Sequence, residues 1–134
     1  MIYLSIGSNL GDKKKNLEKA KYLINLKNID IVCSSSIYKT ASWPDTNFPD
    51  YLNIVIKVNT KLNLIELFKC LKKIEKELGR KKTPKNYPRQ CDIDIIDFNG
   101  LNIKKTVDDQ AIIVPHPRMI NRNFVLFPLF EIDK

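Results

Sequence analysis

A run of apolar residues at helical spacing constrains this chain more than any other feature. Apolar residues recur at intervals of three and four between 64 and 78, at Leu67, Leu71, Ile74 and Leu78. That spacing places them on one face of an α-helix. Asn63 before the run is a good N-cap, and Gly79 after it is a good helix stop. The pattern predicts an amphipathic helix that must bury one face against another layer.

The rest of the chain alternates between strand and helix patterns. Apolar and polar residues alternate over 2–6 and again over 51–58, which is the period of a half-buried strand. Residues 29–38, which are rich in β-branched side chains and Ser, are expected to form another strand, and so are residues 91–98 before Asn99 and Gly100. A second helical pattern runs to residue 26 after a possible cap at Asp12. The predicted order is β-α-β-β-α-β, followed by a C-terminal extension.

This order predicts an α+β fold. Two strand-helix-strand units suit a ferredoxin-like α/β sandwich, in which both helices cover one face of a mainly antiparallel sheet. The 134 residues are enough for one domain with its own core, so we expect a single domain over 1–134.

The cysteines and the N-terminus indicate a compartment. Cys33, Cys70 and Cys91 are odd in number and have no CxxC spacing, which favours free thiols in a reducing compartment. Neither a secretion signal nor an apolar stretch of about 20 residues is present in the sequence. We therefore expect a cytoplasmic protein.

The charge of the chain points to an anionic partner. Lys and Arg number 23 against 15 acidic residues, which gives a net charge of +8. A nucleic acid, an acidic membrane surface and a phosphorylated small ligand all fit that charge. Charge alone does not choose among them.

Two acidic residues form the first candidate site. Asp92 and Asp94 are two apart in a predicted strand, so both side chains leave the same face with Cα atoms about 7 Å apart. Hard oxygen ligands at this spacing suit Mg²⁺, which takes further ligands from water and substrate phosphates. Asp97 has the opposite parity and is predicted on the other face. The alternative is a pair of solvated acids on an exposed sheet.

A cationic segment precedes these acids. Its positive side chains are spread over a loop punctuated by Gly and Pro, at Arg80, Lys81, Lys82, Lys85 and Arg89. Such cations beside a metal site can neutralise the charge that develops during transfer of a polyphosphate. A solvated basic loop or a nucleic-acid patch is the alternative.

His116 is the single histidine of the chain, between Pro115 and Pro117 and shortly before Arg118 and Arg122. A neutral imidazole in this setting can donate to a phosphate oxygen, although a buried structural histidine is the common alternative. The chain has no GxxxxGK[ST] loop and no protein-kinase signature. Any use of ATP must therefore rely on another fold.

Seven short segments carry a resemblance to a known family. They are 6–12 (IGSNLGD), 36–40 (SIYKT), 49–53 (PDYLN), 75–80 (EKELGR), 88–94 (PRQCDID), 114–119 (VPHPRM) and 122–126 (RNFVL). In this order they resemble the 6-hydroxymethyl-7,8-dihydropterin pyrophosphokinase family, which moves a pyrophosphoryl group from ATP to a pterin alcohol in folate biosynthesis.

The resemblance implies a site. Asp92 and Asp94 would hold two Mg²⁺ ions, and the catalytic set would be Asp92, Asp94, Arg89 and Lys82. The nucleotide would contact Glu75, Lys82, Lys85, Arg89, His116 and Arg122. The pterin would contact Thr40, Tyr51, Asn53 and Phe124.

The residue types in the implied pterin pocket fit a flat, polar-edged ring. Asn53 faces away from the apolar side of its strand, and its amide offers both a donor and an acceptor. Tyr51 and Phe124 can sandwich the ring. Lys82 and Lys85 stand where family members often have arginines, and a lysine lacks bidentate reach.

By this resemblance the chain would be a monomer whose partners are ATP and 6-hydroxymethyl-7,8-dihydropterin, with no nucleic acid and no membrane. The alternative is a ferredoxin-like nucleic-acid-binding module, which the net charge of +8 and aromatic residues near strand ends favour. Asp92 and Asp94 argue against it, because carboxylates on the sheet would repel phosphates.

Overall fold

The computed structural model describes residues 1–41, 47–79, 90–117, 128–129 and 131–132. Its helices and strands are β1 (Ile2–Ser8), α1 (Lys13–Leu26), β2 (Ile29–Ser34), β3 (Tyr38–Thr40), β4 (Tyr51–Thr60), α2 (Leu64–Glu77), β5 (Asp92–Phe98), β6 (Ile103–Val107) and β7 (Gln110–Val114). Short helical stretches occur at 128–129 and 131–132.

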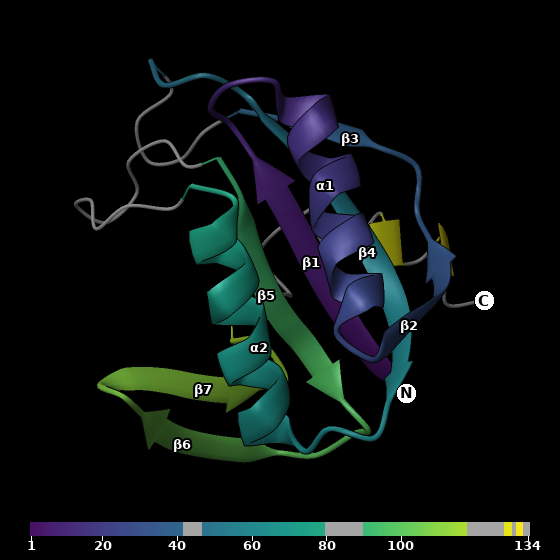
Figure 1. Cartoon of the computed structure of the whole chain (residues 1–134), viewed down its shortest axis with the longest axis vertical. Coiled ribbons are helices and arrows are strands. Elements are labelled where there is room, and N and C mark those ends of the chain that lie inside the picture. The colour runs from purple at the N-terminus through teal and green to yellow at the C-terminus, as the bar shows by residue number, and fades with distance from the viewer. Residues whose placement is uncertain (42–46, 80–89, 118–127, 130, 133–134) are drawn as a thin grey trace.

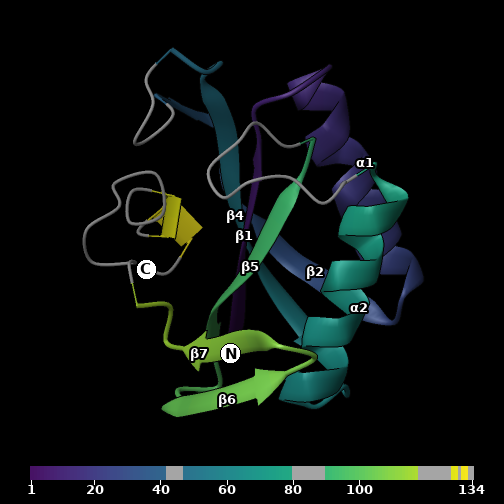
Figure 2. The ribbon, with the colours of Figure 1, turned by 90° about the vertical axis from the view of Figure 1, so that its left-hand side faces the viewer.

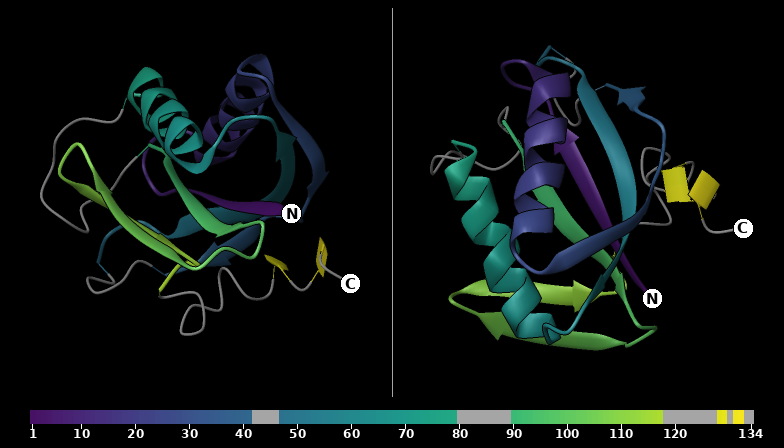
Figure 3. Two further views of the ribbon diagram at one scale, coloured as in Figure 1. Left: turned by 90° about the horizontal axis from the view of Figure 1, so that it is seen from below. Right: turned by 45° about the vertical axis from the view of Figure 1, so that its right-hand side comes forward.

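The fold is α+β with an antiparallel sheet, as predicted. Five strands form the sheet in the order β2-β4-β1-β5, and β3 pairs with β4 outside this path. Both helices cover one face of this sheet (Figure 1, and Figure 3, left). The separate β6-β7 hairpin lies beside the start of α2.

The helices begin at the predicted caps. Asn63 Oδ1 accepts from the Glu66 N–H at 2.8 Å, and Glu66 Oε1 accepts from the Asn63 N–H at 2.9 Å, which forms a capping box. Asp12 caps α1 by accepting from the Lys15 N–H at 3.2 Å. Gly79, with φ of +93°, follows α2 as predicted. No helix in the described part of the chain combines the length and the apolar character needed to cross a membrane.

The core lies between the sheet and the helices. Alternate strand residues supply it, at Leu4, Ile6, Ile54, Ile56 and Ile93, together with helix residues Leu17, Ile24, Leu67, Leu71 and Ile74. Each of these residues is at most 3% exposed. The predicted amphipathic pattern of α2 is therefore confirmed, and its apolar face is the main contact with the sheet.

The structure corrects the single strand predicted over residues 29–38. The chain leaves β2 after Ser34 and enters β3 at Tyr38. At the break, the Ser35 N–H donates to the Val55 carbonyl at 2.9 Å, and the Val55 N–H donates to Ser35 Oγ at 3.0 Å. A side-chain hydroxyl thus replaces a backbone carbonyl in the ladder, which ends the regular register.

A bulge in β5 corrects the predicted position of Asp97. Leu4 pairs with Ile95 while Tyr3 pairs with Asp97, so Ile96 is an extra residue on β5. Strand partners share a face, and Tyr3 and Ile96 belong to the small buried cluster on the side away from the helices. Asp97 therefore lies on the same face as Asp94, and the prediction from parity is wrong.

The C-terminal residues cover part of the face opposite the helices. Leu129 and Ile132 pack against Tyr3, Val55 and Ile96. Figure 2 shows these helical stretches on one side of the sheet and α1 and α2 on the other. The predicted C-terminal extension thus contains the β6-β7 hairpin and a short apolar cover for the sheet.

Candidate active site

One row of residues crosses four strands on the face opposite the helices. Asn53 of β4 pairs with Tyr38 on one side and with Gly7 on the other, and Gly7 pairs with Asp92. Partners in an antiparallel sheet direct their side chains to the same face. We call Tyr38, Asn53, Gly7 and Asp92 the polar row. It lies where β1 ends and β4 and β5 begin.

Asp94 lies next to the polar row on the same face. It pairs with Ser5, which in turn pairs with Val55. Asp92 and Asp94 are both partly exposed, while Ile93 between them is 1% exposed and faces the helices. The predicted separation of the two acids from the apolar face of β5 is therefore confirmed.

The two acids have the chemistry of a hard-cation site. Their carboxylate oxygens project from one strand beside Gly7 and the short side chain of Ser5. In the described ranges, no group of three His, Cys, Asp or Glu side chains is arranged to hold a metal. The arrangement fits Mg²⁺, which is often bound by one or two carboxylates together with water and substrate phosphates.

The structure brings together three of the residues predicted to contact a pterin. Asn53 is 2% exposed, and its Nδ2 donates to Thr40 Oγ1 at 2.9 Å. Thr40 pairs with Tyr51 across β3 and β4. Both pairs lie at the end of the sheet that also carries Asp92. The hydrogen bond to Thr40 fixes the orientation of the Asn53 amide.

Gly7 provides the space for this group. A Cβ atom at position 7 would lie 2.8 Å from Asn53 Oδ1 and 3.3 Å from Tyr51 Cδ1. The first distance is too short for any side chain, so the Asn53 amide occupies space that only a glycine leaves open. A glycine inside an alternating strand is a general signal for such a close approach.

The turn after β1 holds the residues that precede Tyr51. Asn9 is 1% exposed, and its Nδ2 donates to the Pro49 carbonyl at 3.4 Å. Lys13 Nζ donates to the Asp50 carbonyl at 2.9 Å. Asn9 thus joins the 6–12 segment to the 49–53 segment, and Lys13 at the start of α1 adds a second contact to the residues before β4.

Glu75 lies away from the polar row, inside the helix layer. Its side chain is 1% exposed, and Oε2 accepts from the Ile93 N–H at 2.6 Å. Lys72 Nζ lies 3.2 Å from Oε1 of the same carboxylate. The carboxylate thus holds the backbone between Asp92 and Asp94 from the opposite side of the sheet.

His116 is attached to the strand that carries the acids. Its backbone N–H donates to the Ile96 carbonyl at 2.8 Å, and its side chain is partly exposed. The structure therefore places His116 beside β5. The other predicted contacts, at Lys82, Lys85, Arg89, Arg122 and Phe124, lie outside the described residues.

Sequence reasoning missed a pair of residues at the end of the row. Glu131 Oε1 accepts from the Tyr38 hydroxyl at 2.8 Å, although 93 residues separate them. This hydrogen bond, together with partial burial and the nearby negative charge, raises the pKa of Tyr38 above its ordinary 10.0. No local pattern links positions so far apart in the chain.

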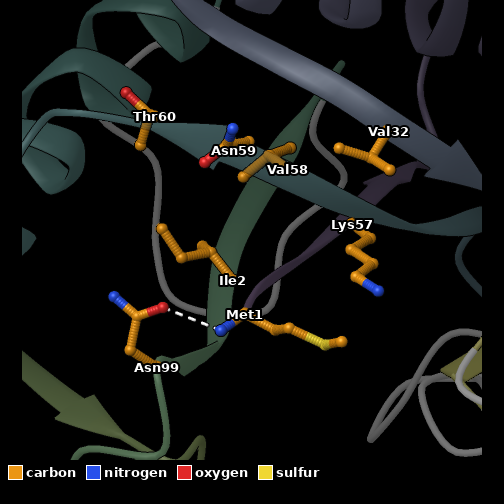
Figure 4. Close-up of a pocket in the computed structure, with 8 residues that line it drawn as sticks. All are labelled: Met1, Ile2, Val32, Lys57, Val58, Asn59, Thr60 and Asn99. Atoms are coloured by element: carbon orange, nitrogen blue, oxygen red, sulfur yellow. Dashed lines mark hydrogen bonds between the residues drawn. The ribbon is translucent and has the colours of Figure 1, made fainter.

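A cavity of about 360 Å³ lies at the other end of the sheet (Figure 4). It is lined by Met1, Ile2, Val32, Lys57, Val58, Asn59, Thr60 and Asn99. The N-terminal ammonium donates to Asn99 Oδ1 at 2.8 Å within it. None of the predicted site residues lines this cavity, so it is separate from the candidate site.

Comparison with known proteins gives related sequences over almost the whole chain. The model of the 7,8-dihydro-6-hydroxymethylpterin-pyrophosphokinase (HPPK) family matches residues 3–134. The 2-amino-4-hydroxy-6-hydroxymethyldihydropteridine pyrophosphokinase of Bacillus subtilis is 39% identical over 131 residues, which cover 97% of this chain and 76% of that protein. The folic acid synthesis protein fol1 of Pneumocystis carinii is 38% identical over 132 residues, which cover 98% of this chain and 17% of that protein.

A solved structure shares the fold. A chain from a crystal structure of HPPK-DHPS in complex with substrates superimposes with a TM-score of 0.67 at 17% sequence identity. The match covers 98% of this chain and 39% of that chain. The present chain thus corresponds to most of the Bacillus protein and to a smaller part of the two larger proteins.

Proposed function

Because this chain belongs to the 7,8-dihydro-6-hydroxymethylpterin-pyrophosphokinase family and is a pyrophosphokinase of folate biosynthesis, we propose that the polar row and Asp94 form its active site. The enzyme transfers a pyrophosphoryl group from ATP to the hydroxymethyl group of 6-hydroxymethyl-7,8-dihydropterin and releases AMP. The observation behind this proposal is the strand pairing, in which Gly7 is opposite Asn53 on one side and opposite Asp92 on the other.

The sheet supports a ferredoxin-like core. Its strand order β2-β4-β1-β5 sets the first and last strands of the β-α-β-β-α-β unit side by side. Each helix then connects two strands that have a third strand between them, and both helices cover the same face. Both helices thus lie on the face opposite the polar row.

Asp92 and Asp94 would hold Mg²⁺, and we assign two ions to them. These two carboxylates would supply the oxygen ligands, and the ions they hold would supply positive charge to the transferring phosphoryl group. The protein contributes a fixed spacing, since both acids lie on one strand whose backbone Glu75 holds from behind. Ile93, between the two acids, is buried and anchors the strand in the core.

The pterin would lie over Asn53. The amide is fixed by its hydrogen bond to Thr40, so it presents its remaining polar atoms to the pterin edge without first reorienting. Tyr51, paired with Thr40, would stack on one side of the ring, and Phe124 would take the other side. The hydroxymethyl group of the substrate would then point along the row toward Asp92.

The triphosphate would lie on the β5 side of the row. His116, held to β5 through Ile96, would contact a phosphate oxygen. Glu75, which the resemblance set among the nucleotide contacts, is buried and accepts from the Ile93 N–H, so it would support the strand that carries the acids without touching the nucleotide. Further contacts would come from Lys82, Lys85, Arg89 and Arg122. The pterin alcohol would attack the β-phosphorus on the side opposite the departing AMP oxygen, in line with it.

We further propose that the enzyme acts as a cytoplasmic monomer. Cys33, Cys70 and Cys91 all lie in the described part of the chain and form no disulfide there, which agrees with a reducing compartment. Sedimentation equilibrium at micromolar concentration tests the monomer directly, and a mass of two chains would contradict it.

Incubation with ATP, Mg²⁺ and 6-hydroxymethyl-7,8-dihydropterin tests the activity. We expect AMP to form in a pterin-dependent manner, without ADP. Formation of ADP, or AMP formation that does not depend on pterin, would contradict the proposal. Tight binding to RNA with a steep salt dependence and no turnover would instead favour the nucleic-acid-binding alternative.

A further inference from the structure

A network of polar contacts joins the C-terminal residues to the start of β3. The two carboxylate oxygens of Glu131 accept from the Ser36 N–H at 3.0 and 3.2 Å. The Ser36 hydroxyl and the Tyr38 hydroxyl each donate to the same carboxylate at 2.8 Å. We call these contacts the Glu131 clasp. It joins segments that are 93 to 95 residues apart in the chain.

The clasp is held in place by apolar contacts on either side of Glu131. Leu129 and Ile132 pack against Tyr3, Val55 and Ile96 on the face opposite the helices. Figure 2 shows this C-terminal stretch beside that face. Glu131 therefore reaches the break between β2 and β3 from a fixed position on the sheet.

The clasp supplies a hydrogen-bond acceptor for the Ser36 N–H, which the pairing of β2 and β3 with β4 does not provide. Ser36 lies between the end of β2 and the start of β3, so its N–H has no place in the regular strand pairing. Ser36 is exposed, so its N–H would otherwise bond to water, which imposes no single backbone geometry. A carboxylate that accepts from this N–H and two hydroxyls therefore gives the break one defined conformation.

The strand held by the clasp carries part of the pterin pocket. β3 has three residues and pairs only with β4 among the described strands. Its first residue, Tyr38, is opposite Asn53, and its last, Thr40, accepts the hydrogen bond that orients the Asn53 amide. So short an edge strand has little stability of its own. Its position therefore depends on what anchors its ends.

We propose that Glu131 is a positioning residue for pterin recognition. By fixing Ser36 and Tyr38, it sets the position of β3, and through Thr40 it sets the orientation of the Asn53 amide. It acts through these residues and does not contact the substrate. This inference rests on the proposed function, in which Asn53 and Thr40 bind the pterin.

Substitution of Glu131 by Gln tests the proposal, because it keeps the side-chain size and removes the charge that the three donors share. Pterin binding is measured by calorimetry in the presence of Mg²⁺ and an unreactive ATP analogue, and the analogue alone is measured separately. We expect Glu131→Gln to weaken pterin binding about tenfold and to change the affinity for the analogue less than about twofold. The KM for pterin should rise similarly, with kcat nearly unchanged.

Two companion variants sharpen this test. Glu18→Gln removes an exposed carboxylate on α1 and should leave both affinities unchanged. Tyr38→Phe removes one donor of the clasp but keeps the ring, and it should weaken pterin binding about threefold. In the Glu131→Gln background the same change should add little, since the hydroxyl acts through Glu131. If Glu131→Gln does not fold, Ser36→Ala, which removes a clasp donor that lies outside the polar row, takes its place beside Tyr38→Phe.

The contrary outcomes are distinct. A lower unfolding midpoint for Glu131→Gln with unchanged pterin affinity would overturn the inference and leave Glu131 a structural residue. Equal losses for pterin and the ATP analogue would overturn it as well, since they would indicate general loosening. If wild-type protein and Glu18→Gln both fail to turn over pterin, the proposed function itself fails.

Discussion

The two faces of the five-stranded sheet follow different rules. On the helix side, alternate residues of all the long strands are apolar and share one core, so each side chain has many neighbours. On the opposite side, each residue of the polar row has a separate role. Gly7 leaves space for the Asn53 amide, and Asn53 presents an amide that a hydrogen bond orients. Substitutions on the first face should change stability, and those on the second face should change function.

Strand β5 contains both rules within three residues. Ile93 is buried against the helices, while Asp92 and Asp94 project to the other side. Glu75 connects the two faces, because it is buried on the helix side and holds the backbone between the acids. Burial of Ile93 and the hydrogen bond from its N–H to Glu75 thus hold the backbone that carries Asp92 and Asp94.

The largest expected effect comes from a matched pair in β5. Asp94→Ala should lower kcat at saturating Mg²⁺ by at least about a hundredfold, with the unfolding midpoint nearly unchanged, because Asp94 lies outside the core. Ile93→Val should do the reverse, with a loss of about 0.5–1.5 kcal/mol in unfolding free energy and near-normal kcat. Steady-state AMP formation and urea denaturation of both variants provide the measurement.

A rate for Asp94→Ala within about threefold of wild type would refute the metal assignment. Asp97→Asn is the control for Asp94→Ala, because Asp97 lies on the same face but binds the chain itself. Its Oδ1 accepts from the Gly100 N–H at 3.2 Å in the turn after β5. We expect this variant to keep most of its activity.

An intermediate effect is expected at Gly7. In Gly7→Ala, the new methyl group would force Asn53 Oδ1 away from a position 2.8 Å distant, so pterin affinity should fall about tenfold. Gly100→Ala is the control, because a Cβ at that position meets nothing within 4 Å and its φ of +72° makes the change a backbone strain alone. It should lower stability without changing pterin affinity, and calorimetry with denaturation separates the two results.

The smallest effect is expected from pH. The Tyr38 pKa is raised above 10.0 in the folded protein, so the unfolded chain loses this proton first as pH rises. The stability that the Tyr38 hydroxyl contributes is therefore complete below pH 10 and is lost as pH rises through the raised pKa. The difference in unfolding free energy between wild type and Tyr38→Phe should be constant from pH 7 to 9 and shrink above pH 10. Urea denaturation at each pH measures it, and a difference that grows above pH 10 would contradict the assigned direction.

Local patterns determined much of this protein. Helix spacing and the caps at Asp12 and Asn63 predicted both helices, because these signals act over a few residues. Strand parity correctly separated Asp92 and Asp94 from Ile93. The resemblance of short motifs to a family also placed Thr40, Tyr51 and Asn53 at one site, where the structure brings them together.

Turns and irregularities were harder to predict. The β6-β7 hairpin turns at Asp108 and Asp109, both with positive φ, and this pair is a weaker signal than the Asn-Gly or Asp-Gly pairs that favour such turns. The bulge at Ile96 moves Asp97 to the face opposite the one predicted. The alternation of apolar and polar residues in a sequence does not show where a strand has an extra residue.

Only the tertiary structure decided the contacts between distant segments. The need for glycine at position 7 arises only because β4 places the Asn53 side chain beside it. Glu131 meets Tyr38 only because the C-terminal residues pack on the sheet. Sequence period reports which face a residue takes, because that choice follows from backbone geometry and burial. Which residues then meet across strands depends on the pairing of the whole sheet, and that is a property of the folded chain.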